Sequence, residues 1–291
     1  MSLLLHADIK SFINNLRIYP RDVLFDVFVR YALSPMVKVV KRWDTLPSWS
    51  TLLKELLKEQ SFLLVVLDSC RYDFFRLVYR KYFYGKLMAT RSLGTNTYGW
   101  LPNIFSYTEF RDVRIFYAGL AIKTHDIKLN EFISHSRDIE IIRIEPCREK
   151  DMGTVLPWEV NEVVLRKKLS KRNIVWYMQP HYPWIGYRDL SLKLLNEVTW
   201  HDFTPKDLVR EGIKHKGISR HDIIKAYLDN LRKALKATST LVREIRDRFT
   251  GKIVITSDHG ELLGEYGLYL HPHYELPQLC IVPWLEVEGI I

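Results

Sequence analysis

Two apolar segments of the chain end in acids, and one of them also ends in a histidine. The segment "KIVITSDHGELLGEYG" (252–267) runs into Asp258 and His259, and "SFLLVVLDSCRYD" (61–73) runs into Asp68. Short apolar runs rich in β-branched residues predict buried strands. Ligands of parallel α/β sheets bind beyond the carboxyl ends of the strands, so we expect these three side chains to meet there. Two carboxylates and an imidazole predict a divalent-metal site.

Simpler interpretations exist for two of these residues, since Asp68 could cap the following helix and His259 could be a loop histidine. Asp68 taken alone is better explained as a helix cap. The complete string Ser-Asp-His-Gly-Glu directly after a strand favours the metal site. Gly260 is expected to let the chain turn where a Cβ would obstruct it.

A third segment, "SLGTNTYGWLPNIFS" (92–106), combines glycine and hydroxyl residues with a helix start expected at Thr97 or Tyr98. The N-terminus of a helix presents unpaired N–H groups and the positive end of the helix dipole, which suits a phosphate or sulfate group. A hydroxyl held there on a metal can act as a nucleophile. The alternative is an ordinary N-cap threonine.

The elements that must position these residues alternate between strands and helices. Alternation of this kind predicts an α/β fold, with a mostly parallel central sheet covered by helices on both faces. Residues 186–220 are polar and irregular, and they are expected to form an insertion near the rim of the sheet. Strands are expected at 62–67, 113–119, 139–144, 173–178 and 252–256, and helices at 159–170 and 220–249.

These segments together resemble the alkaline phosphatase/sulfatase superfamily, in its phosphoglycerol-transferase-like branch. "MQPHYPWIG" (178–186) resembles the family's mid-chain histidine segment, and "LHPHYELPQLCIVPWLEV" (270–287) resembles the segment where a further histidine precedes a late strand. The resemblance runs from about residue 60 to 288. It implies an alkaline-phosphatase-like catalytic domain over 61–291, preceded by a helical extension over 1–60 that packs on it.

The resemblance also implies roles for individual residues. Thr97 would be the nucleophile, with Thr95 as its rival because Thr95 also follows Gly94. Arg71 and Asp73 lie in the family's first motif; Arg71 could hold the phosphate, although a structural salt bridge with a nearby acid is at least as good an interpretation. The implied metal ligands are Asp68, Thr97, Asp258 and His259, the implied catalytic residues are Thr97, His181 and His271, and the implied substrate-binding residues are Arg71, His181 and His273.

Departures from the family narrow the chemistry. Sulfatases oxidise a cysteine or serine to formylglycine, and a threonine cannot form that aldehyde because its Cβ carries a methyl group. The mid-chain segment offers a histidine without a clear aspartate. One divalent metal ion is therefore expected, Mg²⁺ or Mn²⁺ in preference to Zn²⁺ because oxygen ligands outnumber nitrogen. A second metal is not excluded.

The expected function is a metal-dependent hydrolase or phosphotransferase that acts on phosphoesters through a threonine nucleophile. Two enzymatic alternatives are a sulfuric ester hydrolase and a phosphoglycerol- or phosphoethanolamine-type transferase that modifies lipids or glycans. The third alternative is a non-catalytic binding protein with a degenerate site.

Composition bounds the partners and the compartment. The formal net charge is +9, and the basic helical pattern near the N-terminus keeps a peripheral membrane contact open, whereas specific nucleic-acid binding is not expected. The sequence contains no apolar run of the length that a transmembrane helix requires. Cys70, Cys147 and Cys280 are widely spaced and expected to be reduced, so a cytoplasmic location is expected.

Overall fold

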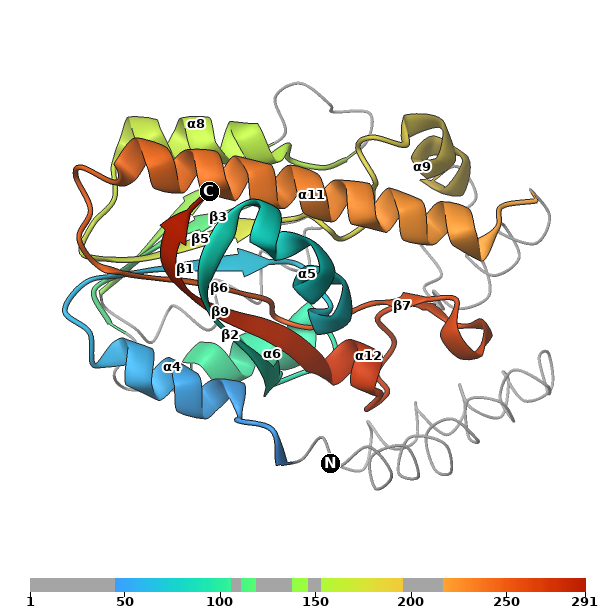
Figure 1. Ribbon diagram of the computed structural model, residues 1–291, viewed down its shortest axis with the longest axis horizontal. Helices are drawn as coiled ribbons and strands as arrows, with labels where there is room; N and C mark the ends of the chain where they lie inside the picture. The colour runs from blue at the N-terminus through green and yellow to red at the C-terminus, as the bar shows by residue number, and fades with distance from the viewer. Residues whose placement is uncertain (1–44, 106–110, 119–137, 146–152, 196–216) are drawn as a thin grey trace, which may run out of the picture.

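The computed structural model describes residues 45–105, 111–118, 138–145, 153–195 and 217–291. Seven strands of this part form one sheet in the order β2-β9-β6-β1-β5-β3-β4, and a two-stranded hairpin, β7-β8, lies beyond one end of it (Figure 1). The strands of the large sheet are β1 (Phe62–Leu67), β2 (Phe83–Arg91), β3 (Val113–Tyr117), β4 (Ile139–Arg143), β5 (Arg172–Tyr177), β6 (Lys252–Thr256) and β9 (Ile281–Ile290). The hairpin consists of β7 (Leu262–Leu263) and β8 (Tyr269–Leu270).

The sheet is mostly parallel. β1 pairs in parallel with β5 and β6, and β3 pairs in parallel with β4 and β5. β9 pairs antiparallel with both β6 and β2. All six residues of β1 are buried, as expected for a strand covered on both faces.

Helices cover both faces, which confirms the predicted fold class. Leu63, Val65 and Leu67 of β1 pack with residues of α5 (Tyr72–Val78), α8 (Pro157–Lys167) and α11 (Arg220–Ile245). The alternate residues Leu64 and Val66 pack with α4 (Trp49–Leu57) and α6 (Thr97–Phe105). Figure 1 shows α8 and α11 above the sheet and α4 and α6 below it.

Several boundaries match the predictions closely. β1 and β6 occupy the predicted 62–67 and 252–256, and the other three predicted strands shift or shorten by one or two residues. Strand β2 was not predicted, and helix α9 (Arg188–Leu195) lies in the insertion that was expected to be irregular. The remaining short elements are η3 (Tyr79–Lys81), η5 (Glu265–Gly267) and α12 (Pro277–Cys280).

Helix α4 is the described part of the predicted N-terminal extension. Its Trp49 is fully buried, packs edge-on against Trp100 and Trp284, and donates a hydrogen bond from Nε1 to Thr256 Oγ1 at 3.0 Å. Residues 1–44, including the basic helical pattern, lie outside the described residues, so the division at residue 60 stays a prediction. Among the described helices, none combines the length and apolarity needed to cross a membrane.

Candidate active site

Asp68, Asp258 and His259 converge where β1 and β6 end. One potential ligand atom from each lies within 4.8 Å of the others, and all three residues are buried. We call these residues the strand-end triad. Two carboxylate oxygens and one imidazole nitrogen at this spacing are a donor set that fits a divalent cation. Their convergence was predicted from the strand ends, and their role as ligands stays a prediction.

Thr97 joins the strand-end triad from the first turn of α6. Its Oγ1 donates a hydrogen bond to Asp258 Oδ2 at 2.9 Å and lies 3.2 Å from His259 Nε2. The cap of this helix is Asn96, whose Oδ1 accepts a hydrogen bond from the Gly99 N–H at 2.9 Å. The N-cap interpretation of Thr97 is therefore wrong, and its hydroxyl is directed at the triad instead. No hydrogen bond joins Thr95 to the triad in the described structure.

The local backbone orients the ligand atoms of Asp258 and His259. Asp258 Oδ1 accepts hydrogen bonds from the backbone N–H of Ser69 at 3.1 Å and of His259 at 2.8 Å, which leaves Oδ2 facing Thr97. His259 Nδ1 lies 2.8 Å from the Gly260 carbonyl oxygen. A proton on Nδ1 would be held by that carbonyl, so that Nε2 faces the site as a ligand would.

The three ionisable groups of the strand-end triad shift one another's pKa values. Burial raises the pKa of Asp68 well above its usual value, and the nearby Asp258 raises it further. Burial would also raise the pKa of Asp258, but His259 outweighs it and lowers that pKa. Burial opposes charge on His259, yet Asp258 raises the pKa of the imidazole to about 9. Metal binding must therefore displace protons from this site.

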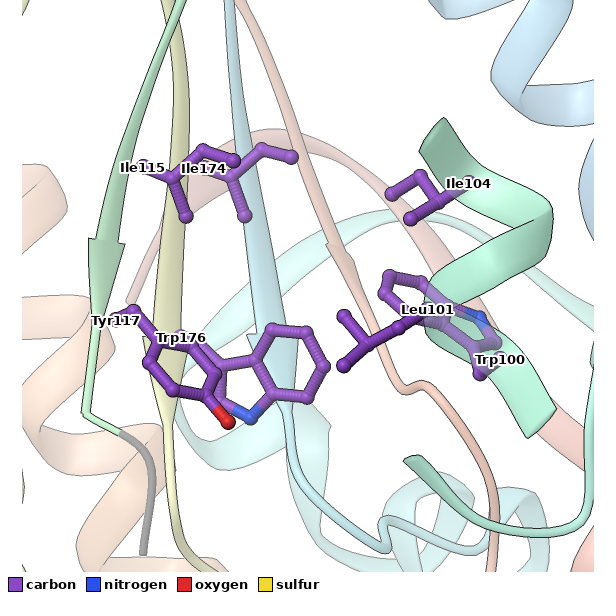
Figure 2. A pocket seen from close by; sticks show the side chains of 7 residues that line it. All are labelled: Trp100, Leu101, Ile104, Ile115, Tyr117, Ile174 and Trp176. Atoms are coloured by element: carbon purple, nitrogen blue, oxygen red, sulfur yellow. The ribbon is translucent and has the colours of Figure 1, made fainter. Parts of the chain in front are cut away.

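Asp68 is held by two side chains that the sequence analysis did not single out. Trp176 Nε1 donates a hydrogen bond to Asp68 Oδ2 at 3.2 Å, and Ser69 Oγ donates one to Oδ1 at 3.1 Å. Trp176 also lines the apolar pocket in Figure 2, between α6 and strands β3 and β5. The pocket does not suit a phosphate group, because its lining is apolar and aromatic and carries no charged side chain. Its lining consists of Trp100, Leu101, Ile104, Ile115, Tyr117, Ile174 and Trp176.

A second cluster lies beside the strand-end triad. Potential ligand atoms of His181, Glu261 and His271 also lie within 4.8 Å of one another. We call these residues the histidine cluster. The His271 ring bridges the two groups, since its centroid is 4.6 Å from that of His259 and 5.0 Å from that of His181. His181 and His271 were predicted site residues, whereas no role was predicted for Glu261, the last residue of the Ser-Asp-His-Gly-Glu string.

Glu261 makes the histidine cluster an unusual environment for an anion. Its side chain is 3% exposed, and neither carboxylate oxygen accepts a hydrogen bond of normal geometry among the described residues. The nearest cationic candidate is His271, whose Nδ1 lies 3.6 Å from Oε1. Burial raises the pKa of Glu261. A buried carboxylate with unsatisfied oxygens beside two imidazoles is a donor set that fits a cation.

His181 presents a lone pair to this cluster. Burial lowers the pKa of His181 to about 4, so the ring is neutral at neutral pH. Its Nδ1 contacts the Tyr182 carbonyl oxygen, and a proton there leaves Nε2 unprotonated on the other side of the ring. A neutral imidazole with an inward lone pair suits a cation or a proton better than a phosphate oxygen.

Arg71 is committed to protein contacts. Its guanidinium forms a bidentate pair with Asp73, with N–O distances of 3.0 and 2.6 Å, and Nη1 donates to Glu265 Oε1 at 2.7 Å and to the Glu261 carbonyl at 3.2 Å. The salt-bridge interpretation therefore describes Arg71 better than the substrate-binding one. These contacts tie the turn after β1 to the loop that carries Glu261.

His273 is exposed and sits over the start of α6. Its Nδ1 lies 2.7 Å from Nδ2 of Asn96, the residue that precedes Thr97. The structure thus brings five of the predicted site residues into the two adjoining groups, adds Thr97 to the triad, holds His273 beside them, and commits Arg71 to protein contacts. The close approach at Gly260 is also real, but a Cβ there would meet the Gln278 carbonyl oxygen at 1.9 Å rather than the site itself.

The described cysteines form no disulfide, as predicted. Cys70 and Cys280 are buried, and Cys147 lies outside the described residues. Burial raises the pKa of the Cys70 thiol well above its usual value, and Asp73 and Asp258 raise it further. A thiol with a raised pKa is a poor nucleophile, which agrees with the expectation that Cys70 is inert.

Part of the chain is similar in sequence to phosphoethanolamine transferases. No family model matches the chain. A segment of 95 residues, 30% of the chain, is 32% identical to phosphoethanolamine transferase EptA of two Escherichia coli strains, K12 and O157:H7. The matched segment covers 17% of the length of those relatives. The superfamily resemblance seen in the motifs is confirmed.

Solved structures match the chain at low sequence identity and with TM-scores below 0.5. The C-terminal periplasmic domain of phosphoethanolamine transferase EptC from Campylobacter jejuni matches with a TM-score of 0.49 and 16% identity, over 77% of each chain. The integral membrane protein lipooligosaccharide phosphoethanolamine transferase A from Neisseria meningitidis matches with a TM-score of 0.48 and 16% identity. The match covers 98% of this chain and 59% of that one.

The expected cytoplasmic location is wrong in the light of these comparisons. The similar proteins are described as a periplasmic domain and an integral membrane protein. The expectation rested on widely spaced cysteines and on the lack of a long apolar run in the sequence. Cysteines that are buried without a disulfide, as Cys70 and Cys280 are, carry little information about the compartment.

Proposed function

We propose that the chain is a metal-dependent phosphotransferase that carries a substituted phosphoryl group on Thr97. The observation that carries this proposal is the Thr97 hydroxyl, 2.9 Å from Asp258 and 3.2 Å from His259 inside a buried set of potential metal ligands. A hydroxyl in that position is a nucleophile candidate. Two other described hydroxyls contact carboxylates of the triad, Ser69 at Asp68 Oδ1 and Ser257 at Asp258 Oδ1, but neither contacts the Oδ2 of Asp258 that Thr97 binds.

In this proposal Thr97 Oγ1 attacks phosphorus and the bond to the leaving oxygen breaks. A divalent cation on the strand-end triad would supply charge neutralisation and would lower the pKa of the Thr97 hydroxyl. Asp258 orients that hydroxyl through its Oδ2. An acceptor hydroxyl then attacks the phosphothreonine and releases Thr97. Mg²⁺ or Mn²⁺ suits the oxygen-rich triad, with Zn²⁺ as the alternative.

Transfer is favoured over hydrolysis by the kind of relatives that match. EptA of Escherichia coli is named a phosphoethanolamine transferase, and so are the two solved proteins described above. We therefore propose phosphoethanolamine, or a similarly substituted phosphate, as the group that is moved. A sulfuric ester hydrolase is disfavoured because Thr97 cannot become formylglycine.

A second cation in the histidine cluster is a separate part of the proposal. It is supported by Glu261, which is buried without a hydrogen-bond donor of normal geometry, and by the neutral imidazole of His181. A cation there would be held by His181, Glu261 and His271 and would stabilise the Glu261 carboxylate. His271 and the exposed His273 remain the candidates for contact with the substrate.

A transfer assay with a labelled donor tests the function. The protein, loaded with Mn²⁺, is incubated with phosphatidylethanolamine labelled in its headgroup, with and without a lipid or glycan acceptor. Label that appears on the acceptor faster than as free phosphoethanolamine supports a transferase. Release of free phosphoethanolamine alone would identify a hydrolase. Absence of both products with every metal tested would favour the non-catalytic alternative.

A further inference from the structure

Helix α11 carries two polar side chains on its buried face. Tyr227 and Asn230 are 0% exposed and lie among the apolar residues that pack this helix on the sheet, such as Ala226 and Leu231. They are three residues apart, so they lie side by side on one face of the helix. Buried polar groups need hydrogen-bond partners, and those of Tyr227 and Asn230 lie on two different loops.

Tyr227 is bonded to the turn that follows Asp68. Its hydroxyl donates a hydrogen bond to the Ser69 carbonyl oxygen at 2.8 Å and accepts one from the Arg71 N–H at 2.9 Å. Ser69 has a φ of +60°, a conformation that is unfavourable for a non-glycine residue. The phenolic oxygen of Tyr227 thus bonds to both ends of the turn from Ser69 to Arg71, which directly follows Asp68 of the strand-end triad.

Asn230 is bonded to the loop that carries His181. Its Nδ2 donates hydrogen bonds to the carbonyl oxygens of His181 at 3.1 Å and Pro183 at 3.0 Å, and its Oδ1 accepts one from the Ile185 N–H at 2.9 Å. Both amide protons and the amide oxygen are therefore used on a single loop. The amide fixes the backbone of His181 while leaving its ring directed at the histidine cluster.

The two side chains belong to one rigid element but serve different groups of site residues. We propose that α11 sets the position of the histidine cluster relative to the strand-end triad, with Tyr227 and Asn230 as the positioning residues. A direct link between the two loops exists in the hydrogen bond from His181 N–H to the Asp68 carbonyl at 3.2 Å. The helix adds a second connection on each side, so that both loops are fixed to a common support.

The inference rests on the proposed function only in taking the strand-end triad and the histidine cluster as binding sites for metal ions and substrate. It is tested with Tyr227→Phe, which removes one oxygen, and Asn230→Leu, which keeps a branched side chain of similar size but no hydrogen bonds. Ser239→Ala is the matched control, because Ser239 is buried on the same helix and its hydroxyl bonds to Lys236 of that helix. The affinities for Mn²⁺ and then for inorganic phosphate are measured by calorimetry on each full-length variant.

Tyr227→Phe is expected to lower the affinity for the Mn²⁺ ion of the strand-end triad by about tenfold or more, because loss of a group that orients metal ligands has an effect of this size. This ion is identified as the equivalent that is missing in Asp258→Asn. Asn230→Leu is expected to leave that equivalent within about twofold of the wild type. It should weaken binding of the other Mn²⁺ equivalent, the one that Glu261→Gln removes, by about tenfold, a change of about 1.4 kcal/mol, and with it phosphate binding to the Mn²⁺-saturated protein. Ser239→Ala should change neither affinity.

Affinities in Tyr227→Phe equal to those of Ser239→Ala would overturn the proposal, and so would an equal loss of both affinities in each variant. If Asn230→Leu does not fold, the Tyr227→Phe variant decides by itself. A wild-type protein that binds Mn²⁺ but neither binds phosphate nor turns over a phosphoester would contradict the proposed function. The Mn²⁺ comparison between Tyr227→Phe and Ser239→Ala would still test the role of α11.

Discussion

The strand-end triad and the histidine cluster lie side by side, yet they differ in how their charges are compensated. Asp258 and His259 are 0% exposed and satisfy each other, with an Oδ2–Nε2 distance of 3.1 Å and backbone donors on Oδ1. Glu261 is almost as buried, and among the described residues its carboxylate oxygens accept no hydrogen bond of normal geometry. Asp258 and His259 can therefore persist without a metal as a hydrogen-bonded ion pair, whereas the Glu261 carboxylate faces imidazoles at longer distances.

This difference separates the tasks of the two groups. A self-satisfied triad with Thr97 attached to it is suited to hold a nucleophile in a fixed orientation. A cluster with an unsatisfied acid and a side chain of His271 that is 26% exposed can take up a charged partner from outside. Substitutions that affect one group and spare the other would sharpen the contrast, and substitutions that affect both equally would remove it.

The largest expected effect follows removal of the nucleophile. Thr97→Ala should lower turnover of a phosphoester by about a thousandfold or more, because the covalent step is lost. Unfolding in urea should change little, since Asn96 rather than Thr97 caps α6. Thr97→Ser should keep measurable activity because it retains the hydroxyl. Normal turnover in Thr97→Ala together with loss of turnover in Thr95→Ala would move the nucleophile by two residues.

Metal stoichiometry should separate the two groups. Asp258→Asn should lose the cation bound by the triad, because a neutral amide replaces the carboxylate shared by Thr97 and His259. Glu261→Gln, the matched substitution in the histidine cluster, should retain that cation and lose the second one. Metal content after dialysis, measured by plasma mass spectrometry, checks both. One equivalent in the wild type and in Glu261→Gln would show that the histidine cluster holds no cation.

The two histidines should give the metal-free protein opposite pH dependences. The pKa of His259 is raised from 6.5 to about 9, so its contribution to stability is complete below pH 6.5 and is lost as the pH rises toward 9. The pKa of His181 is lowered from 6.5 to about 4, so stability is lost as the pH falls from 6.5 toward 4. Each change should have a slope of up to about 1.4 kcal/mol per pH unit.

Urea unfolding of the chelator-treated protein at a series of pH values measures this dependence. The free energy of unfolding should be greatest near pH 6.5. His259→Gln should flatten the alkaline side, and His181→Gln should reduce the slope of the acid side, where Asp258 also contributes because its pKa is lowered. Identical pH profiles for the two variants would contradict the assigned environments.

The smallest expected effect concerns the thiols. Cys70 is buried beside Asp68, and burial raises its pKa, so iodoacetamide at neutral pH should not modify it in the folded protein. Turnover should be unchanged after treatment. Peptide mapping measures the modification, with the urea-unfolded protein as the positive control. Rapid labelling of Cys70 in the folded protein would mean that the turn after β1 opens far more readily than its hydrogen bonds imply.

The sequence allowed prediction of the parts of the site that are local in the chain. Asp68 and Asp258 follow buried strands, and the parallel pairing of β1 with β6 brings their ends together. The burial of all six residues of β1 likewise follows from its continuous apolar run. β2 could not be recognised, because its partly exposed residues belong to a strand that pairs only with the antiparallel β9 within the described sheet.

Contacts that cross the fold could not be read from the chain in advance. The pairing of Arg71 with Glu265 spans 194 residues and decides between a structural and a substrate-binding role. Glu261 was visible as an acid in a motif, but its lack of hydrogen-bond donors is a property of the packed structure. Asn230 did leave a signal, since it is a polar residue at a position of α11 where the helical period requires an apolar one.

The central claim is that Thr97 forms a covalent phosphoryl adduct that depends on the strand-end triad. Mass spectrometry of the Mn²⁺-loaded protein, digested after brief incubation with phosphatidylethanolamine, tests it most directly. We expect a phosphoethanolamine adduct on the peptide that contains Thr97, located to that residue by fragmentation and missing in Asp258→Asn. An adduct on another residue, or turnover of the donor with Thr97 unmodified under conditions that trap intermediates, would contradict the account.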